Sequence, residues 1–175
     1  MARNSGNVTL EDVTIAFRNF AGKEDVYNRE GDRNFSVFLS NEDAAKLIDA
    51  GWNVKFLKPR DDEDLGQAFV KVDVSYKKRP PRVGMVTSRG ITYLTEEQVE
   101  MIDWVDIETA DVTLNPYEWV VNGKTGIKAY LQTLFVKIEE DYLQMKWTSM
   151  VEEQKALPTG YIDGELVDSP YELER

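Results

Sequence analysis

The stretch QAFVKVDVSY, residues 67–76, alternates apolar side chains with polar or aromatic ones. Successive side chains of a β-strand point to opposite faces, so this period of two predicts a strand with one buried face. The predicted buried face carries Ala68, Val70, Val72, Val74 and Tyr76, and the opposite face carries Phe69, Lys71, Asp73 and Ser75. The sequence therefore predicts a sheet whose outer face displays an aromatic ring beside a cation.

The same period recurs along most of the chain. At residues 13–18 it places Val13, Ile15 and Phe17 on the buried face and Thr14, Ala16 and Arg18 on the outer face. Residues 34–39, 111–121 and 126–140 are also strand-like, and Asn122 followed by Gly123 favours a hairpin turn between the last two. Five or six strands joined by hairpins, without a βαβ rhythm, predict a mainly-β fold, a small antiparallel barrel or sandwich.

Helical spacing is confined to two short segments. Residues 40–51 begin with Ser40 or Asn41 as the N-cap and end at Gly51, which favours the left-handed conformation of a helix end. Residues 95–102 place Thr95 and Gln98 at the spacing of a capping box. We therefore expect one or two short helices beside the sheet.

The composition excludes several classes of protein. The 175 residues include no cysteine and no histidine, which removes thiolate or imidazole zinc sites, cysteine nucleophiles and Ser/His/Asp triads. We expect no cofactor, no metal and no enzymatic activity. There is no apolar run of membrane-spanning length and no secretory signal pattern, so we expect a cytoplasmic protein without membrane contact.

The C-terminal segment differs in character from the rest of the chain. We divide the sequence into one domain at residues 1–150 and an acidic tail at residues 151–175, which has too few apolar residues to form a core and is expected to be disordered. Tail residues expected to contact a partner protein, or to compete with a ligand of the main domain, are Tyr161, Asp163, Glu165, Asp168, Tyr171, Glu172 and Glu174.

Positive charge gathers in one part of an acidic chain whose formal net charge is −11. Between Lys71 and Tyr93 there are six cations and one acid, and such a cluster favours a polyanionic partner. The phosphate contacts predicted here are Lys77, Lys78, Arg79, Arg82 and Arg89, with Arg18, Lys71 and Lys128 extending the track. Phe69 and Tyr130, predicted on the outer face, are the candidates for stacking on single-stranded bases, although each could instead fill the core.

Four blocks of the sequence resemble bacteriophage single-stranded DNA-binding proteins of the OB-fold type. They are FRNFAGKEDVYNREGDRNFSVFL (17–39), GWNVKFLKPR (51–60), YKKRPPRVGMVTSRG (76–90) and WVDIETADVTLNPYEWVVNGKTGIKAYLQTLFVKIEED (104–141). The resemblance implies that residues 1–150 form an OB-fold-like, nucleic-acid-binding barrel that coats single-stranded DNA during phage replication and recombination in the host cytosol. It also implies an acidic tail that gates binding or contacts phage or host replication and recombination proteins. Many such tails end in an aromatic residue after an acidic run, whereas this chain ends in YELER.

Two other classes of function stay open at this point. An acidic protein of this kind could inhibit a host nucleic-acid-binding protein by mimicking its ligand's charge. The cluster Asp61, Asp62, Glu63 and Asp64 could hold Mg²⁺ in a nuclease, although a solvated loop is the simpler interpretation. The sequence is also compatible with a homo-oligomer.

Overall fold

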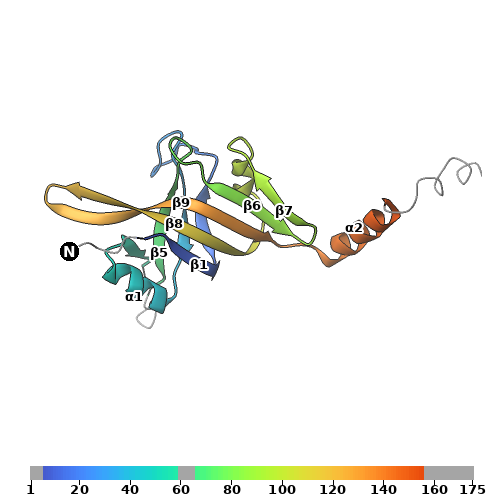
Figure 1. The fold of residues 1–175 in the computed structure, drawn as a ribbon, viewed down its shortest axis with the longest axis horizontal. Helices are drawn as coiled ribbons and strands as arrows, with labels where there is room; N and C mark the ends of the chain where they lie inside the picture. The colour runs from blue at the N-terminus through green and yellow to red at the C-terminus, as the bar shows by residue number, and fades with distance from the viewer. Residues whose placement is uncertain (1–5, 59–65, 156–175) are drawn as a thin grey trace, which may run out of the picture. The chain divides into compact units, whose positions relative to one another are not determined.

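A computed structural model describes residues 6–58 and 66–155 (Figure 1). Its strands are β1 (Val8–Val13), β2 (Ile15–Asn19), β3 (Arg33–Phe38), β4 (Val54–Phe56), β5 (Ala68–Val74), β6 (Arg82–Thr87), β7 (Gly90–Leu94), β8 (Ile107–Val121) and β9 (Lys124–Ile138). Its helices are α1 (Asn41–Asp49), the 3₁₀ helix η1 (Val99–Asp103) and α2 (Tyr142–Lys155). Within the described residues, no helix has the length and apolar character needed to cross a membrane.

The strands form one mixed sheet that is mainly antiparallel. Its central path runs β1-β8-β9-β5-β3-β2, while β4 pairs with β5, and β6 pairs with β7 and β9. The two ends of this path, β1 and β2, are separated in sequence by Thr14 alone, so the sheet curls until its ends meet at one bend of the chain. The mainly-β prediction is confirmed. The pairing does not close into a ring, however, and β9 runs parallel to both β5 and β6.

The core lies on the inner face of this curled sheet. On β5 the predicted alternation is confirmed, because Ala68, Val70, Val72 and Val74 are buried and Lys71 is exposed. Full burial of an aliphatic side chain stabilises the fold by roughly 1.5–3 kcal/mol. Burial of these four residues therefore fixes the orientation of β5 and decides which of its side chains lie on the outer face.

A β-bulge in β2 changes the prediction for residues 13–18. The register with β3 shifts between Ala16 and Asn19, and Phe17 has a positive φ of 51°. An inserted residue re-aims the side chains that follow it. As a result, Phe17 is 60% exposed rather than buried, and Arg18 turns its guanidinium toward η1. The prediction that Phe17 is a core residue is wrong for this reason.

The short helices follow their capping signals. The hydroxyl of Ser40 accepts a hydrogen bond from the Asp43 amide at 3.1 Å, and Gly51 after α1 has a φ of 97°. The amide of Thr95 donates to Oε1 of Gln98 at 3.1 Å, but the helix that follows is a 3₁₀ helix of five residues, η1. The chain divides into a compact unit that ends at Glu139 and a second unit that begins at Glu140 and contains α2, a helix that the sequence pattern does not predict.

Candidate nucleic-acid interface

A groove of about 820 Å³ lies where the loop after β5 meets the outer faces of β8 and β9. We call it the basic groove. Its lining consists of Asn7, Ser75, Lys77, Lys78, Arg79, Pro80, Asn115, Pro116, Tyr117, Tyr130, Leu131 and Gln132. Four residues that the sequence predicts for nucleic-acid binding, three cations and one tyrosine, therefore share one groove.

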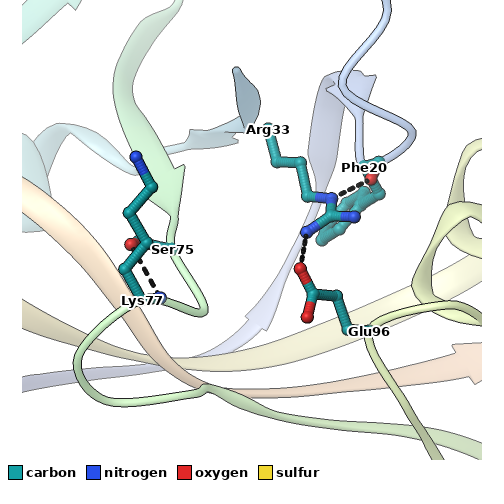
Figure 2. A network of polar contacts seen from close by, with 5 residues as sticks. All are labelled: Phe20, Arg33, Ser75, Lys77 and Glu96. Carbon is teal, nitrogen blue, oxygen red and sulfur yellow. Dashed lines mark hydrogen bonds and ion pairs between the residues drawn. The ribbon is translucent and has the colours of Figure 1, made fainter. Parts of the chain in front are cut away.

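The loop that supplies these cations is held at both ends. At its start, the amide of Lys77 donates to the Ser75 hydroxyl at 3.4 Å (Figure 2). At its end, Pro81 is buried and β6 begins at Arg82 with parallel pairing to β9. Lys77, Lys78 and Arg79 are exposed, and none of the three forms an ion pair within the part of the chain that the structure describes. Their charges therefore face the groove without a carboxylate partner.

Arg33 anchors the end of β5, where this loop begins. Its Nε donates to the Phe20 carbonyl at 3.0 Å, and its Nη1 lies 2.9 Å from Oε1 of Glu96 (Figure 2). The guanidinium also lies over the ring of Tyr76, 5.2 Å from its centroid. Burial raises the pKa of Tyr76, whose hydroxyl has no hydrogen-bond partner among the described residues. Tyr76 therefore packs against the core and supports the start of the loop. This agrees with the sequence prediction that its ring lies on the buried face.

An edge-to-face pair of tyrosines forms the aromatic part of the basic groove. The rings of Tyr117 and Tyr130 are 5.9 Å apart at an interplanar angle of 85°. Tyr117 is 56% exposed and Tyr130 is half-buried. A perpendicular pair leaves ring surface available to a third planar group, and a nucleobase is such a group.

A second, smaller hollow of about 240 Å³ continues along the same outer face. We call it the cationic hollow, and it is lined by Asn53, Lys55, Val70, Lys71, Asp73, Trp119, Ile127, Lys128 and Ala129. Asp73 in this hollow and Ser75 in the basic groove are successive outer-face positions along β5 and the loop after it, so the two depressions adjoin.

The cationic hollow also contains an acid. Lys128 Nζ lies 3.0 Å from Oδ2 of Asp73 and 5.4 Å from the centroid of the Tyr130 ring. Burial acts against the charge on Lys128, but the Asp73 carboxylate outweighs it and raises the pKa of the lysine above its ordinary value. Lys128 is therefore charged and paired with Asp73, and both Lys128 and Lys71 are exposed.

Three predicted phosphate contacts lie outside both depressions. Arg82 lies over the ring of Tyr93, 5.8 Å from its centroid, and Arg89 sits in the turn between β6 and β7. Arg18 donates from Nη1 to the carbonyls of Ile102 and Val105, both at 2.7 Å. The sequence predicts that Arg18 points to the outer face. In the structure it points toward η1, because the bulge reverses the direction of its side chain.

Two aromatic residues of the outer face are missed by the sequence analysis. Tyr117 follows Asn115 on the outward-facing positions of β8, so continuing the alternation along residues 111–121 would have found it. Phe17 contacts the ring of Phe69 at a centroid distance of 6.2 Å. No sequence signal places Phe17 there, since the bulge depends on pairing with β3. Phe69 itself is half-buried on the outer face, as its strand phase predicts.

Two predicted clusters fall outside the described residues. These are the acids Asp61, Asp62, Glu63 and Asp64 and the tail residues from Tyr161 to Glu174. In residues 6–58 and 66–155, no group of three or more acidic, histidine or cysteine residues is placed to hold a metal ion.

A curled β-sheet with a groove lined by cations and rings defines a class of nucleic-acid-binding modules. Residues 1–173 match the family described as "Putative phage ssDNA-binding domain". The chain belongs to this family of phage single-stranded DNA-binding proteins, which confirms the family that the sequence blocks suggest. No curated protein is matched.

Solved structures of a phage single-stranded DNA-binding protein share this fold. The single-stranded DNA-binding protein of bacteriophage Enc34, as a C-terminal truncation, is similar with a TM-score of 0.53 and 11% identity over 79% of this chain and 88% of that chain. The Enc34 protein in complex with ssDNA is similar with a TM-score of 0.53 and 11% identity over 79% of this chain and 89% of that chain. At this identity, the likeness establishes the arrangement of elements.

Proposed function

We propose that this chain binds single-stranded DNA in the basic groove. The phosphates contact Lys77, Lys78 and Arg79, and a base stacks on the tyrosine pair. The observation that carries the proposal is that one groove is lined by three cations without an ion-pair partner among the described residues and by a partly exposed tyrosine pair. A paired base in a duplex has no face to offer such a ring, so single strands are preferred. The complex of the Enc34 protein with ssDNA supports this assignment.

The proposed role is to coat DNA without reading its sequence and without a catalytic step. Ring surfaces and ammonium groups accept any base and any phosphate, because stacking and charge neutralisation do not depend on base identity. Lys71 and Lys128 in the cationic hollow extend the track beyond the basic groove. DNA exposed during phage replication or recombination is the substrate that such a protein would cover.

The acidic residues after position 150 are proposed to compete with DNA for these cations. A tethered segment acts at an effective concentration of order millimolar, which is enough to displace a weakly bound strand. The same segment, through residues such as Tyr161 and Asp168, is proposed to recruit replication or recombination partners. Removing residues 151–175 should therefore tighten binding at low salt, and an unchanged affinity would refute the gating role.

One titration tests the binding proposal. The full chain is titrated with oligo-dT and with a duplex of equal length, at about 50 and 200 mM salt, by fluorescence anisotropy of labelled DNA. We expect tighter binding of oligo-dT and a loss of affinity between the two salt concentrations. Equal affinity for both DNAs would overturn the stacking role of the tyrosines, and no binding to either would overturn the function.

A further inference from the structure

Phe17 is held in an unfavourable backbone conformation while its ring is exposed. Its φ of 51° lies in the left-handed region, which bulky side chains rarely adopt, and 60% of the residue is accessible. Regular alternation would have buried this ring in the core. Strain that persists without a gain in burial is commonly found where a side chain is positioned for function.

Two other phenylalanines hold the Phe17 ring in place. Its centroid is 6.3 Å from that of Phe38 and 6.2 Å from that of Phe69, at interplanar angles of 75° and 62°. Phe38 and Phe69 are direct partners in the β3–β5 ladder and share the outer face. We call these three residues the phenylalanine platform. Because two edge-to-face contacts restrain Phe17, its ring loses little freedom when a ligand stacks on it.

The surroundings of the phenylalanine platform are cationic. Lys55 is the ladder partner of Phe69 on β4, and Lys71 is the next outer-face residue on β5. Both lysines line the cationic hollow, which adjoins the basic groove. Rings flanked by lysines match a ligand that alternates planar bases with phosphates.

We propose that the phenylalanine platform is a second stacking subsite, and that a bound strand follows the outer face of β5 from the basic groove to Phe17. The inference rests on the proposed function, because it assigns a further subsite to the same ligand. Along β5, the backbone from Phe69 to Val74 covers roughly 16 Å at about 3.3 Å per residue, and the loop that lines the basic groove follows it. A DNA strand that reaches both subsites must span this distance.

The decisive variant is Phe17→Gly in the full chain. Glycine adopts a positive φ without strain, so the variant removes the ring without disturbing the bulge. We expect the affinity for a dT oligonucleotide of about 16 nucleotides to fall roughly 5- to 150-fold, as for the loss of one stacked base. Because no charge changes, the salt dependence stays that of the wild type. A thermal unfolding curve confirms that the variant is folded.

Three further variants make the result interpretable. Phe56→Ala removes a phenylalanine that is 56% exposed on β4 but makes no ring contact with the platform within the described residues, and we expect wild-type affinity. Phe17→Tyr keeps a ring and should restore binding, whereas Phe17→Leu keeps apolar bulk and should not. If Phe17→Gly and Phe17→Leu both bind with wild-type affinity while Tyr130→Ala binds more weakly, the stacking role of the phenylalanine platform is overturned. The proposed role of the basic groove then stands. A wild-type chain that fails to bind oligo-dT would instead overturn the proposed function itself.

Discussion

The ammonium nitrogen of Lys128 lies 3.0 Å from the Oδ2 atom of Asp73, across the parallel pairing of β9 with β5. This ion pair sits in the cationic hollow, between the phenylalanine platform and the tyrosine pair. In the proposed complex, a phosphate in the hollow would compete with the Asp73 carboxylate for Lys128. We therefore expect Asp73 to moderate the proposed DNA affinity of a surface whose other charged lining residues, Lys55 and Lys71, are cations.

The first prediction concerns this competing carboxylate. Asp73→Asn should tighten binding of oligo-dT several-fold at about 50 mM salt, because Lys128 becomes available to a phosphate. The slope of log K against log salt should steepen by about 0.7, the value for one further contact to a single strand. Glu108→Gln, which removes the partner of Lys137, is the matched control and should leave binding unchanged. Weaker binding by Asp73→Asn would show that the carboxylate positions Lys128 for DNA.

The second prediction concerns the basic groove. The double variant Lys78→Ala with Arg79→Ala should weaken binding of every oligonucleotide sequence alike, since phosphates carry no sequence information. The salt slope should become shallower by about 1.4, for two lost contacts at about 0.7 each. Lys46→Ala with Lys137→Ala makes the same change in net charge at two lysines paired with Glu42 and Glu108. If both double variants lose affinity equally, total charge rather than the basic groove governs binding.

The third prediction separates stacking from charge. Tyr130→Ala should weaken oligo-dT binding by about 1–3 kcal/mol, the range for one stacked base, with an unchanged salt slope. Tyr130→Phe keeps the ring and should bind like the wild type. Tyr27→Ala, at a tyrosine that is 91% exposed and lies in the loop before β3, serves as the control. A change of salt slope in Tyr130→Ala would mean that the tyrosine acts through its neighbour Lys128.

Much of this site could be predicted from local patterns. The alternation in residues 67–76 placed Phe69 and Lys71 on the outer face because burial of the valines leaves only one orientation for the strand. Two prolines placed the cationic residues in a loop, since proline cannot donate a ladder hydrogen bond. The hairpin at Asn122 and Gly123 is confirmed, with φ values of 50° and 77°.

The features that escaped prediction depend on contacts between distant segments. The bulge at Phe17 arises from the register of β2 against β3, and no local signal marks it. Parallel pairing of β6 with β9 joins residues about fifty positions apart in the sequence. Arg18 is recognisable as a cation, but its carbonyl partners at Ile102 and Val105 become visible only when η1 is packed against β2.

The fourth prediction assigns Arg18 to stability instead of DNA binding. Arg18→Met should lower the free energy of unfolding by about 1.5–3 kcal/mol, because charged hydrogen bonds to two carbonyls are lost. Arg29→Met, at an exposed arginine of the β2–β3 loop, should change stability little. Urea unfolding measures both variants. Folded Arg18→Met protein should bind oligo-dT with wild-type affinity, and weakened binding without destabilisation would contradict the assignment.

The fifth prediction uses the buried hydroxyl of Tyr76. Because this hydroxyl has no hydrogen-bond partner among the described residues, Tyr76→Phe should raise the free energy of unfolding by about 1 kcal/mol near neutral pH. Urea unfolding of the wild type and the variant at about pH 7.5 measures the difference.

The pH dependence gives the same residue a second, independent readout. Burial raises the pKa of Tyr76, so the folded chain keeps the phenolic proton at a pH where the unfolded chain, with a tyrosine pKa of about 10, has lost it. The stability contributed by this proton is complete below about pH 10 and is lost as the pH rises through the folded-state pKa. Lys128, whose pKa is also raised, titrates in the same alkaline range in both proteins, so its effect cancels in the comparison. The stability advantage of Tyr76→Phe should therefore grow above about pH 10, and a constant difference between the two curves would show that the hydroxyl is hydrated in the folded state.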